Sequence, residues 1–176
     1  MRKFFLLFLL TPFAILAQEG NFQIAILNYN GGGDWYSNLE TSLPNLIEFT
    51  NQNLKTNIKL EQAIVEPSNA ELFDYPFIHM TGHGNVVFNM KEVENLRIYL
   101  MAGGFLHIDD NYGMDQFVRR EIKRIFPNEE LVEIPFSHPI YHQKFDFNNG
   151  LPKIHEHDGK PPMGYGIVVE GRLVIF

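Results

Sequence analysis

The chain has 176 residues, of which 45% are hydrophobic and 20% charged, and these values predict one globular domain and exclude a disordered chain. Its formal net charge of −7 argues against a general partner of nucleic acids or anionic membranes. One basic cluster, formed by Arg119, Arg120, Lys123 and Arg124, follows a helical spacing. We interpret it as the solvated face of a helix, and a polyanion site is the alternative.

Residues 1–17 have the pattern of a secretory signal peptide. Residues 1–3 are Met-Arg-Lys, and the apolar run 4–17 that follows is too short for an ordinary membrane span. Cleavage after Ala17 would leave a mature domain over residues 18–176, and an uncleaved anchor is the alternative. We therefore expect an exported protein, periplasmic or secreted, with no stable membrane span after cleavage and an oligomeric state that the sequence does not indicate.

The next part of the chain predicts strands alternating with helices. Residues 22–30 are a mostly apolar run and predict a buried strand that ends at three glycines. Pro44 suits a first helical turn, and one side of the helix carries Leu43, Leu46, Ile47 and Leu54. Residues 57–65 predict a second strand, and residues 70–73 a short helical turn.

The middle of the chain repeats this alternation. Residues 76–80 predict a third strand, which ends at Thr-Gly-His-Gly. Asn89 and Glu92 have the spacing of a capping box, so they predict a helix start, and the glycine pair 103–104 ends that helix. The stretch GGFLHIDDNYG, residues 103–113, supplies a fourth strand.

The last part predicts one more helix and three strands. Val118, Ile122 and Ile125 mark a helix that Pro127 stops, and residues 131–134 predict a fifth strand. Residues 166–176 predict a β-hairpin with its turn at Glu170 and Gly171. The alternation as a whole predicts an α/β domain with a parallel sheet that is covered on both faces. Because the sequence stops on an apolar strand, we expect the domain to be truncated at its C-terminus.

Three polar loops follow strands of this predicted sheet, and they are the strongest indication of a functional site. In an open parallel sheet, ligands bind beyond the carboxyl ends of the strands. The loops there contribute the candidate ligand-binding residues Gly31, Gly32, Gly33, Asp34, Trp35, Gly82, His83, Gly84, Asp109 and Asp110. Glycine-rich turns allow backbone N–H groups to approach a ligand. The glycine run alone fits neither a dinucleotide fingerprint nor a P-loop, so we expect no nucleotide cofactor.

Asp109 and His83 are the candidate catalytic residues. Neighbouring residues of a strand point to opposite faces, so Asp109 is predicted to face the cleft while Asp110 caps the following helix or turn. His79 and His107 lie inside strand runs, where packing and one hydrogen bond explain them. A divalent metal is a candidate cofactor, with His83, Asp109, His138 and His142 as candidate ligands. The segment His155-Glu156-His157-Asp158 also resembles a metal-binding spacing.

The segments TGHG, GGFLHIDDNYG and FSHPIYH together resemble the exported family called domain of unknown function 4159. The resemblance runs from about Phe22 to Phe176. That family is similar to trehalose-utilisation-protein-like domains of the class I glutamine amidotransferase-like superfamily. The resemblance implies a flavodoxin-like three-layer sandwich with strand order 2-1-3-4-5, plus the C-terminal hairpin.

The same resemblance excludes thiol-dependent glutamine hydrolysis. In glutamine amidotransferases a cysteine follows the strand that corresponds to residues 103–108, and aligning the apolar runs places Asp109 near that position. The chain contains no cysteine, so it has neither that nucleophile nor a disulfide framework or a lipoprotein acylation site. It also lacks a G-x-S-x-G elbow.

Three functions remain open at this point. The first is an exported binding domain for a small polar, saccharide-like or peptide-like ligand, with His83, Asp109 and Trp35 as contacts. The second is a hydrolase, metal-assisted or carboxylate-based, that uses Asp109 and His83 with His138 or His142. The third is a scaffold whose polar loops are only structural. We favour the first, because no complete catalytic constellation can be assembled from the sequence.

Overall fold

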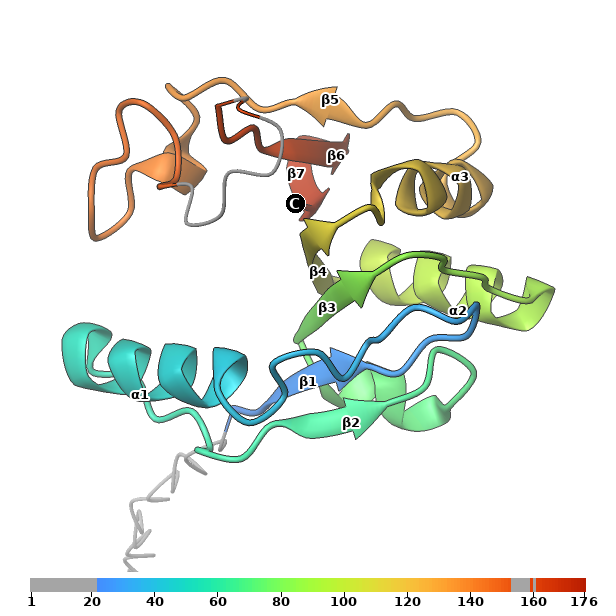
Figure 1. The fold of residues 1–176 in the computed structure, drawn as a ribbon, viewed down its shortest axis with the longest axis horizontal. Coiled ribbons are helices and arrows are strands. Elements are labelled where there is room, and N and C mark those ends of the chain that lie inside the picture. The colour runs from blue at the N-terminus through green and yellow to red at the C-terminus, as the bar shows by residue number, and fades with distance from the viewer. Residues whose placement is uncertain (1–21, 153–158, 160) are drawn as a thin grey trace, which may run out of the picture.

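The computed structural model describes residues 22–152, 159 and 161–176 (Figure 1). The predicted signal peptide lies outside these residues. Within this described part of the chain, seven strands form one sheet in the order β2-β1-β3-β4-β7-β6-β5. The strands are β1 (Ile24–Leu27), β2 (Ala63–Val65), β3 (Phe77–His83), β4 (Phe105–Tyr112), β5 (Val132–Glu133), β6 (Tyr165–Val169) and β7 (Arg172–Ile175).

Helices cover both faces of the sheet, as the alternation of elements predicts (Figure 1). The helices are α1 (Ser42–Leu54), α2 (Met90–Met101) and α3 (Asp115–Ile125), with the short 3-10 turns η1 (Ala70–Asp74) and η2 (Pro139–Tyr141). One face packs under α1 through Ile24, Ile26, Leu43 and Ile47. The opposite face, under α2 and α3, contains the larger core. None of the helices among the described residues is long and apolar enough to cross a membrane.

The first four strands pair in parallel in the predicted order, but the predicted place of the fifth strand is wrong. β7 occupies the position next to β4, in parallel, through the pair Leu106 and Ile175. β5 instead lies at the far edge, antiparallel to β6. The reason is burial, because both residues of β5 are exposed whereas Val174 and Ile175 of β7 are at most 1% exposed. The sheet therefore gains more apolar burial by placing β7 at its centre.

Several local predictions are confirmed. Asn89 and Glu92 form the capping box, with both reciprocal hydrogen bonds present, at the start of α2. The hairpin of β6 and β7 turns at Glu170 and Gly171, which both have positive φ angles of 51° and 78°. After the end of α2, a Cβ atom at Gly104 would lie 2.3 Å from the ring of Tyr99, so this position requires glycine.

Two predicted element boundaries differ from the structure. The second strand covers only Ala63–Val65, and Ile58 contributes one isolated bridge to Phe22. β3 continues through Thr81 and Gly82 to His83, so the polar segment after residue 80 is itself part of the strand.

Candidate functional site

The ends of β3 and β4 lie side by side, so the polar corners of these two strands are neighbours. In the parallel register, Thr81 pairs with Asp109 and Gly82 with Asp110. The loop after β1 joins them through Gly33, whose N–H donates to the carbonyl oxygen of Asn85 at 2.9 Å. The prediction that the three corners meet at one edge of the sheet is confirmed.

Tyr29, which follows β1, lies at the centre of this junction. Its hydroxyl group donates to the carbonyl oxygen of Thr81 at 3.1 Å. A Cβ atom at Gly33 or Gly82 would lie 2.8 or 2.5 Å from this hydroxyl oxygen. Burial, with a smaller contribution from the charges of Asp34 and Asp110, raises the pKa of Tyr29 to about 12. These glycines therefore allow loops to pack around a neutral tyrosine.

His83 and Asp34 pair with each other at the rim of the junction. The ring Nδ1 of His83 lies 3.0 Å from Oδ2 of Asp34, and the backbone N–H of His83 also donates to this carboxylate. Burial acts to raise the pKa of Asp34, but the hydrogen bonds from His83 outweigh it and lower the pKa. Half of the His83 side chain remains exposed. The pair fixes the loop after β1 against the end of β3.

Gly31, Gly33 and Trp35 pack against the protein itself. Asn85 donates its side-chain amide to the carbonyl oxygen of Gly31 at 3.1 Å, and a Cβ atom at Gly31 would lie 2.8 Å from the Asn85 oxygen. A Cβ atom at Gly32 or Gly84 would meet no neighbour within 4 Å. Trp35 packs against both core clusters.

A cavity of about 870 Å³ lies beyond the carboxyl end of β4. Residues 107–112 of β4 form one wall, and α3, the segment around Tyr141 and residues 161–165 form others. Of the predicted ligand-binding residues, Asp109 and Asp110 are among the described residues that line it, whereas Asp34, His83 and the glycines are not. The structure therefore separates the paired rim of His83 and Asp34 from the cavity at β4.

The two adjacent aspartates have different surroundings. The carboxylate of Asp110 accepts hydrogen bonds from the backbone N–H groups of Met114 at 2.9 Å and Asp115 at 3.0 Å. It thereby caps the start of α3, as its position predicts. Asp109 is exposed to the cavity and forms no hydrogen bond with any residue that the structure describes.

Asn111 and Arg119 are cavity residues that the sequence analysis did not identify. The side-chain nitrogen of Asn111 is fully buried and has no hydrogen-bond partner in the part of the chain that the structure describes. Arg119 forms an ion pair with Asp115 at 2.8 Å and lies over the ring of Tyr165, 4.4 Å from its centre. The only sequence signal for Asn111 is its position directly after the two aspartates.

His79 and His107 form a stacked pair on the face of the sheet toward α1. Their Nδ1 atoms are 2.9 Å apart and their ring centres 5.1 Å apart. Burial, followed by the effect of His107, lowers the pKa of His79 to about 3. Burial also lowers the pKa of His107, and the charge of Asp109 opposes that shift. Both rings are therefore neutral at neutral pH, and the predicted packing role with one hydrogen bond is confirmed.

The candidate metal ligands do not come together. His138 accepts a hydrogen bond from the N–H of Ile140 at 3.2 Å, at the start of η2. His142 lies between Asp146, at 3.0 Å, and the carbonyl oxygen of Phe136, at 2.7 Å, and these hydrogen bonds raise its pKa. Over residues 22–152, 159 and 161–176, the structure contains no group of three His, Asp or Glu side chains that could hold a metal ion. The predicted segment of residues 155–158 lies outside the described residues.

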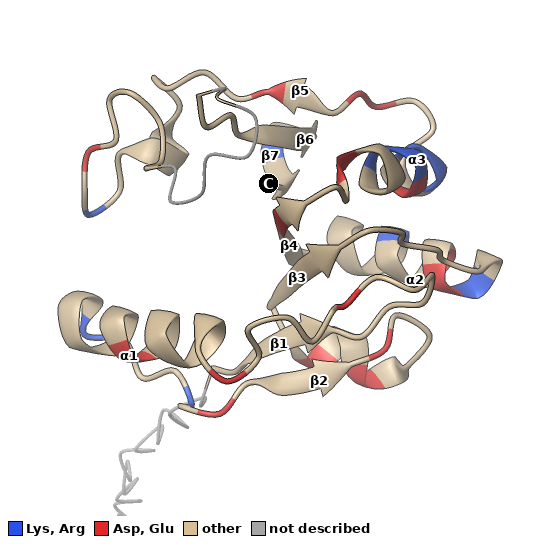
Figure 2. Cartoon of the chain, viewed as in Figure 1, with Lys and Arg blue, Asp and Glu red and all other residues tan. Residues whose placement is uncertain are grey.

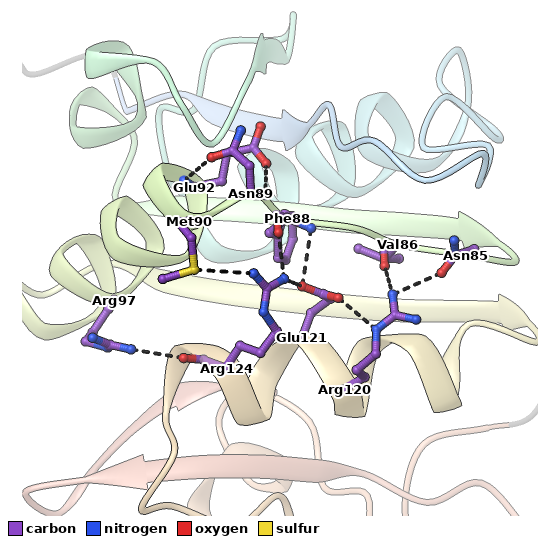
Figure 3. Close-up of polar contacts among 10 residues, drawn as sticks. All are labelled: Asn85, Val86, Phe88, Asn89, Met90, Glu92, Arg97, Arg120, Glu121 and Arg124. Atoms are coloured by element: carbon purple, nitrogen blue, oxygen red, sulfur yellow. Dashed lines mark hydrogen bonds and ion pairs between the residues drawn. The ribbon is translucent and has the colours of Figure 1, made fainter.

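Lys and Arg residues gather on α3 (Figure 2), and their side chains form hydrogen bonds within the protein. Buried Glu121 accepts hydrogen bonds from Arg120 Nε at 2.8 Å, from the backbone N–H of Phe88 at 3.2 Å and from Arg124 (Figure 3). Arg124 also donates to the carbonyl oxygen of Phe88 at 2.6 Å. Lys123 donates to a backbone carbonyl and Arg119 to Asp115. The contacts of Arg120, Glu121 and Arg124 join α3 to the segment before α2, so these residues are structural rather than a free cationic surface.

Comparison with known protein families assigns the chain to a family. The family described as "Domain of unknown function (DUF4159)" matches residues 23–176, which include every strand and helix of the fold. No curated protein matches the chain.

Proposed function

We propose that this chain, which belongs to the DUF4159 family, binds a small polar, saccharide-like ligand in the cavity beyond the carboxyl end of β4. The observation that carries the proposal is a buried amide without a partner. Asn111 lines the cavity, its side-chain nitrogen is buried without a partner among the described residues, and leaving such a donor unpaired costs about 1–3 kcal/mol. A ligand oxygen would supply the missing acceptor.

The other walls of the cavity fit a sugar. The carboxylate of Asp109 can accept hydrogen bonds from hydroxyl groups, and the rings of Tyr141, Tyr165 and Phe176 offer apolar surfaces to C–H groups. Binding cavities for small molecules usually measure about 300–1,000 Å³, and the volume of about 870 Å³ suits one or two sugar units.

The charge of the cavity favours a neutral ligand over an anionic one. Asp109, Asp110 and Asp115 line it, and the one described arginine of the lining, Arg119, already pairs with Asp115. An anionic group such as a phosphate would meet uncompensated negative charge from Asp109. This balance supports the expectation that no nucleotide is bound.

Carboxylate-based hydrolysis is the second candidate. Asp109 and His107 lie two residues apart on one strand and border the same cavity, so a base and a hydrogen-bonding imidazole are near each other. The metal-assisted version has no support, because no three His, Asp or Glu side chains among the described residues lie close enough together to hold a metal ion. Incubation with maltose distinguishes the two, since only a hydrolase releases glucose.

Thermal unfolding of the protein with glucose, N-acetylglucosamine and maltose tests the binding proposal. A ligand that binds only the folded state raises the melting temperature, because it stabilises that state by RT ln(1 + [L]/Kd). We expect an increase with at least one of these sugars, and loss of that increase in Asp109→Asn and Asn111→Ala.

Asp74→Asn is the matched control, because Asp74 is an exposed carboxylate at the end of η1 and does not line the cavity. Without ligand, Asp109→Asn should leave stability unchanged or raise it, since this carboxylate has no hydrogen bond to lose among the described residues. No change in melting temperature with any of the three sugars would contradict the proposal.

Export to the periplasm or the medium is a further part of the proposal, and it depends on residues 1–17 alone. The mass of the mature protein tests it. Cleavage after Ala17 predicts a chain that begins at Gln18, and an intact Met1 in exported material would contradict cleavage.

A further inference from the structure

The histidine pair under the cavity restricts where its two protons can lie. A contact of 2.9 Å between the Nδ1 atoms of His79 and His107 requires one nitrogen to donate and the other to accept. Each neutral ring carries a single N–H, so the choice at this contact also decides which ring has a proton on Nε2. Two arrangements result, and they differ in what each Nε2 atom must do.

The surroundings of the two Nε2 atoms are unequal. Nε2 of His79 is fully buried and has no hydrogen-bond partner within residues 22–152, 159 and 161–176. His107 lines the cavity, and its Nε2 is not among the fully buried unpaired atoms. If His107 donated from Nδ1, His79 would hold an N–H on Nε2 with no acceptor. If His79 donates from Nδ1, its Nε2 is only a bare lone pair.

The second arrangement costs less free energy. Buried N–H groups without an acceptor are the rarest unsatisfied groups in proteins, and acceptors with an unused lone pair are more common. The carboxylate of Asp109, which borders the same cavity, also favours a proton on the cavity side of the His107 ring.

We infer that His107 presents its Nε2–H to the cavity as a hydrogen-bond donor for the ligand, and that His79 is the positioning residue that holds this tautomer. The inference rests on the proposed ligand cavity. It also refines the ligand chemistry. His107 and Asp109 lie on the same face of β4, two residues apart, so a donor and an acceptor face the ligand together. A pair of neighbouring hydroxyl groups can satisfy both, with one oxygen accepting from His107 and the other donating to Asp109.

NMR of the protein with ¹⁵N-labelled histidine tests the proton positions without any ligand. Long-range ¹H–¹⁵N correlations distinguish a protonated ring nitrogen from a bare one. We expect His107 to carry its proton on Nε2 and His79 on Nδ1. His79→Phe removes the donor, and His107 should then populate both tautomers. His79→Asn places an amide N–H near the position of the original Nδ1, and it should restore the single tautomer.

The second readout is the affinity for the sugar that gives the largest thermal shift. Loss of one neutral hydrogen bond corresponds to about a twofold to tenfold weaker affinity, which we expect for His107→Phe but not for His142→Phe on a different loop. A proton on Nδ1 of His107 in the unaltered protein would overturn the inference, whichever sugars bind. If none of the three sugars binds but the proton is found on Nε2, the proposed function is contradicted. His107 then has the inferred tautomer but donates to no sugar ligand.

Discussion

The buried carboxylate of Glu121 is predicted to be the strongest single polar contribution to the stability of the fold. Its two oxygens accept hydrogen bonds from the side chains of Arg120 and Arg124 and from the backbone N–H of Phe88 (Figure 3). In Glu121→Gln the side chain keeps its shape, but one oxygen becomes an NH₂ group that cannot accept a hydrogen bond. The two guanidinium groups then lose their common negative partner, and one of them faces another donor.

The exposure of each partner sets the size of the effect. Removing one member of a fully buried ion pair costs about 3–5 kcal/mol. The Glu121 side chain is 3% exposed, but those of Arg120 and Arg124 are 47% and 36% exposed, so both can turn toward water. The loss should therefore lie at the lower end of that range, at about 3 kcal/mol. This is a large part of the 5–15 kcal/mol by which native domains are typically stable.

Urea unfolding followed by tryptophan fluorescence measures this loss directly. Trp35 is the single tryptophan and packs against both core clusters, so its emission reports unfolding of both faces of the sheet. Glu94→Gln is the matched control, because Glu94 pairs with Arg97 at 3.1 Å but is 57% exposed. We expect the control to lose less than about 1 kcal/mol. An equal loss in the two variants would refute the argument that burial makes Glu121 important.

Two further predictions concern packing and pH. Gly104→Ala should destabilise the protein by about 1–3 kcal/mol, because the new Cβ would lie 2.3 Å from the ring of Tyr99; an unchanged melting temperature would contradict this. Burial lowers the pKa of His79 from 6.5 to about 3, so the unfolded chain binds a proton in this window that the folded chain does not. The free energy of unfolding should fall as the pH decreases between these two pKa values, by up to about 1.4 kcal/mol per pH unit for this residue. Urea unfolding at several pH values measures this dependence, and His79→Phe should show a smaller decrease. The same slope in both proteins would show that His79 binds its proton equally in both states.

Local sequence signals predicted most of the elements and the place where polar residues gather. The capping box of Asn89 and Glu92 uses contacts within a single turn, so residue type and spacing were sufficient. The meeting of the corners after β1, β3 and β4 follows from parallel pairing alone, because all carboxyl ends of parallel strands lie at one edge. The flavodoxin-like classification and the relation to trehalose-utilisation proteins stay predictions.

Long-range pairing was not predictable in the same way. Residues 131–134 and 172–175 are both apolar runs, and the sequence does not show which of them pairs with β4. In the structure, the strand that contains the buried residues Val174 and Ile175 pairs with β4. The structure also differs from the predicted packing of two leucines of α1. Leu46 and Leu54 were expected on the packed side, but they are 44% and 45% exposed, because the core under α1 is small.

The candidate site was also predictable only in part. Glycines at strand ends indicate a close approach of some group, but they do not indicate which group. At Gly82 the nearest group is the hydroxyl of Tyr29, and at Gly33 this hydroxyl is as close as the backbone oxygens of His83 and Asn85. Tyr29 lies 52 residues along the chain from the Thr81 carbonyl that it binds. The unpaired amide of Asn111 depends on the whole surrounding of the residue, so no local pattern could reveal it.

The side-chain amide signal of Asn111 in ¹⁵N-labelled protein gives the most direct test of ligand binding in the cavity at β4. On addition of glucose, N-acetylglucosamine or maltose, we predict that this signal shifts and that its protons exchange more slowly with water, because the amide gains an acceptor. The amide of Asn53, which donates to the carbonyl oxygen of Phe49 on exposed α1, should not change. An Asn111 signal that stays in place with all three sugars would contradict the account.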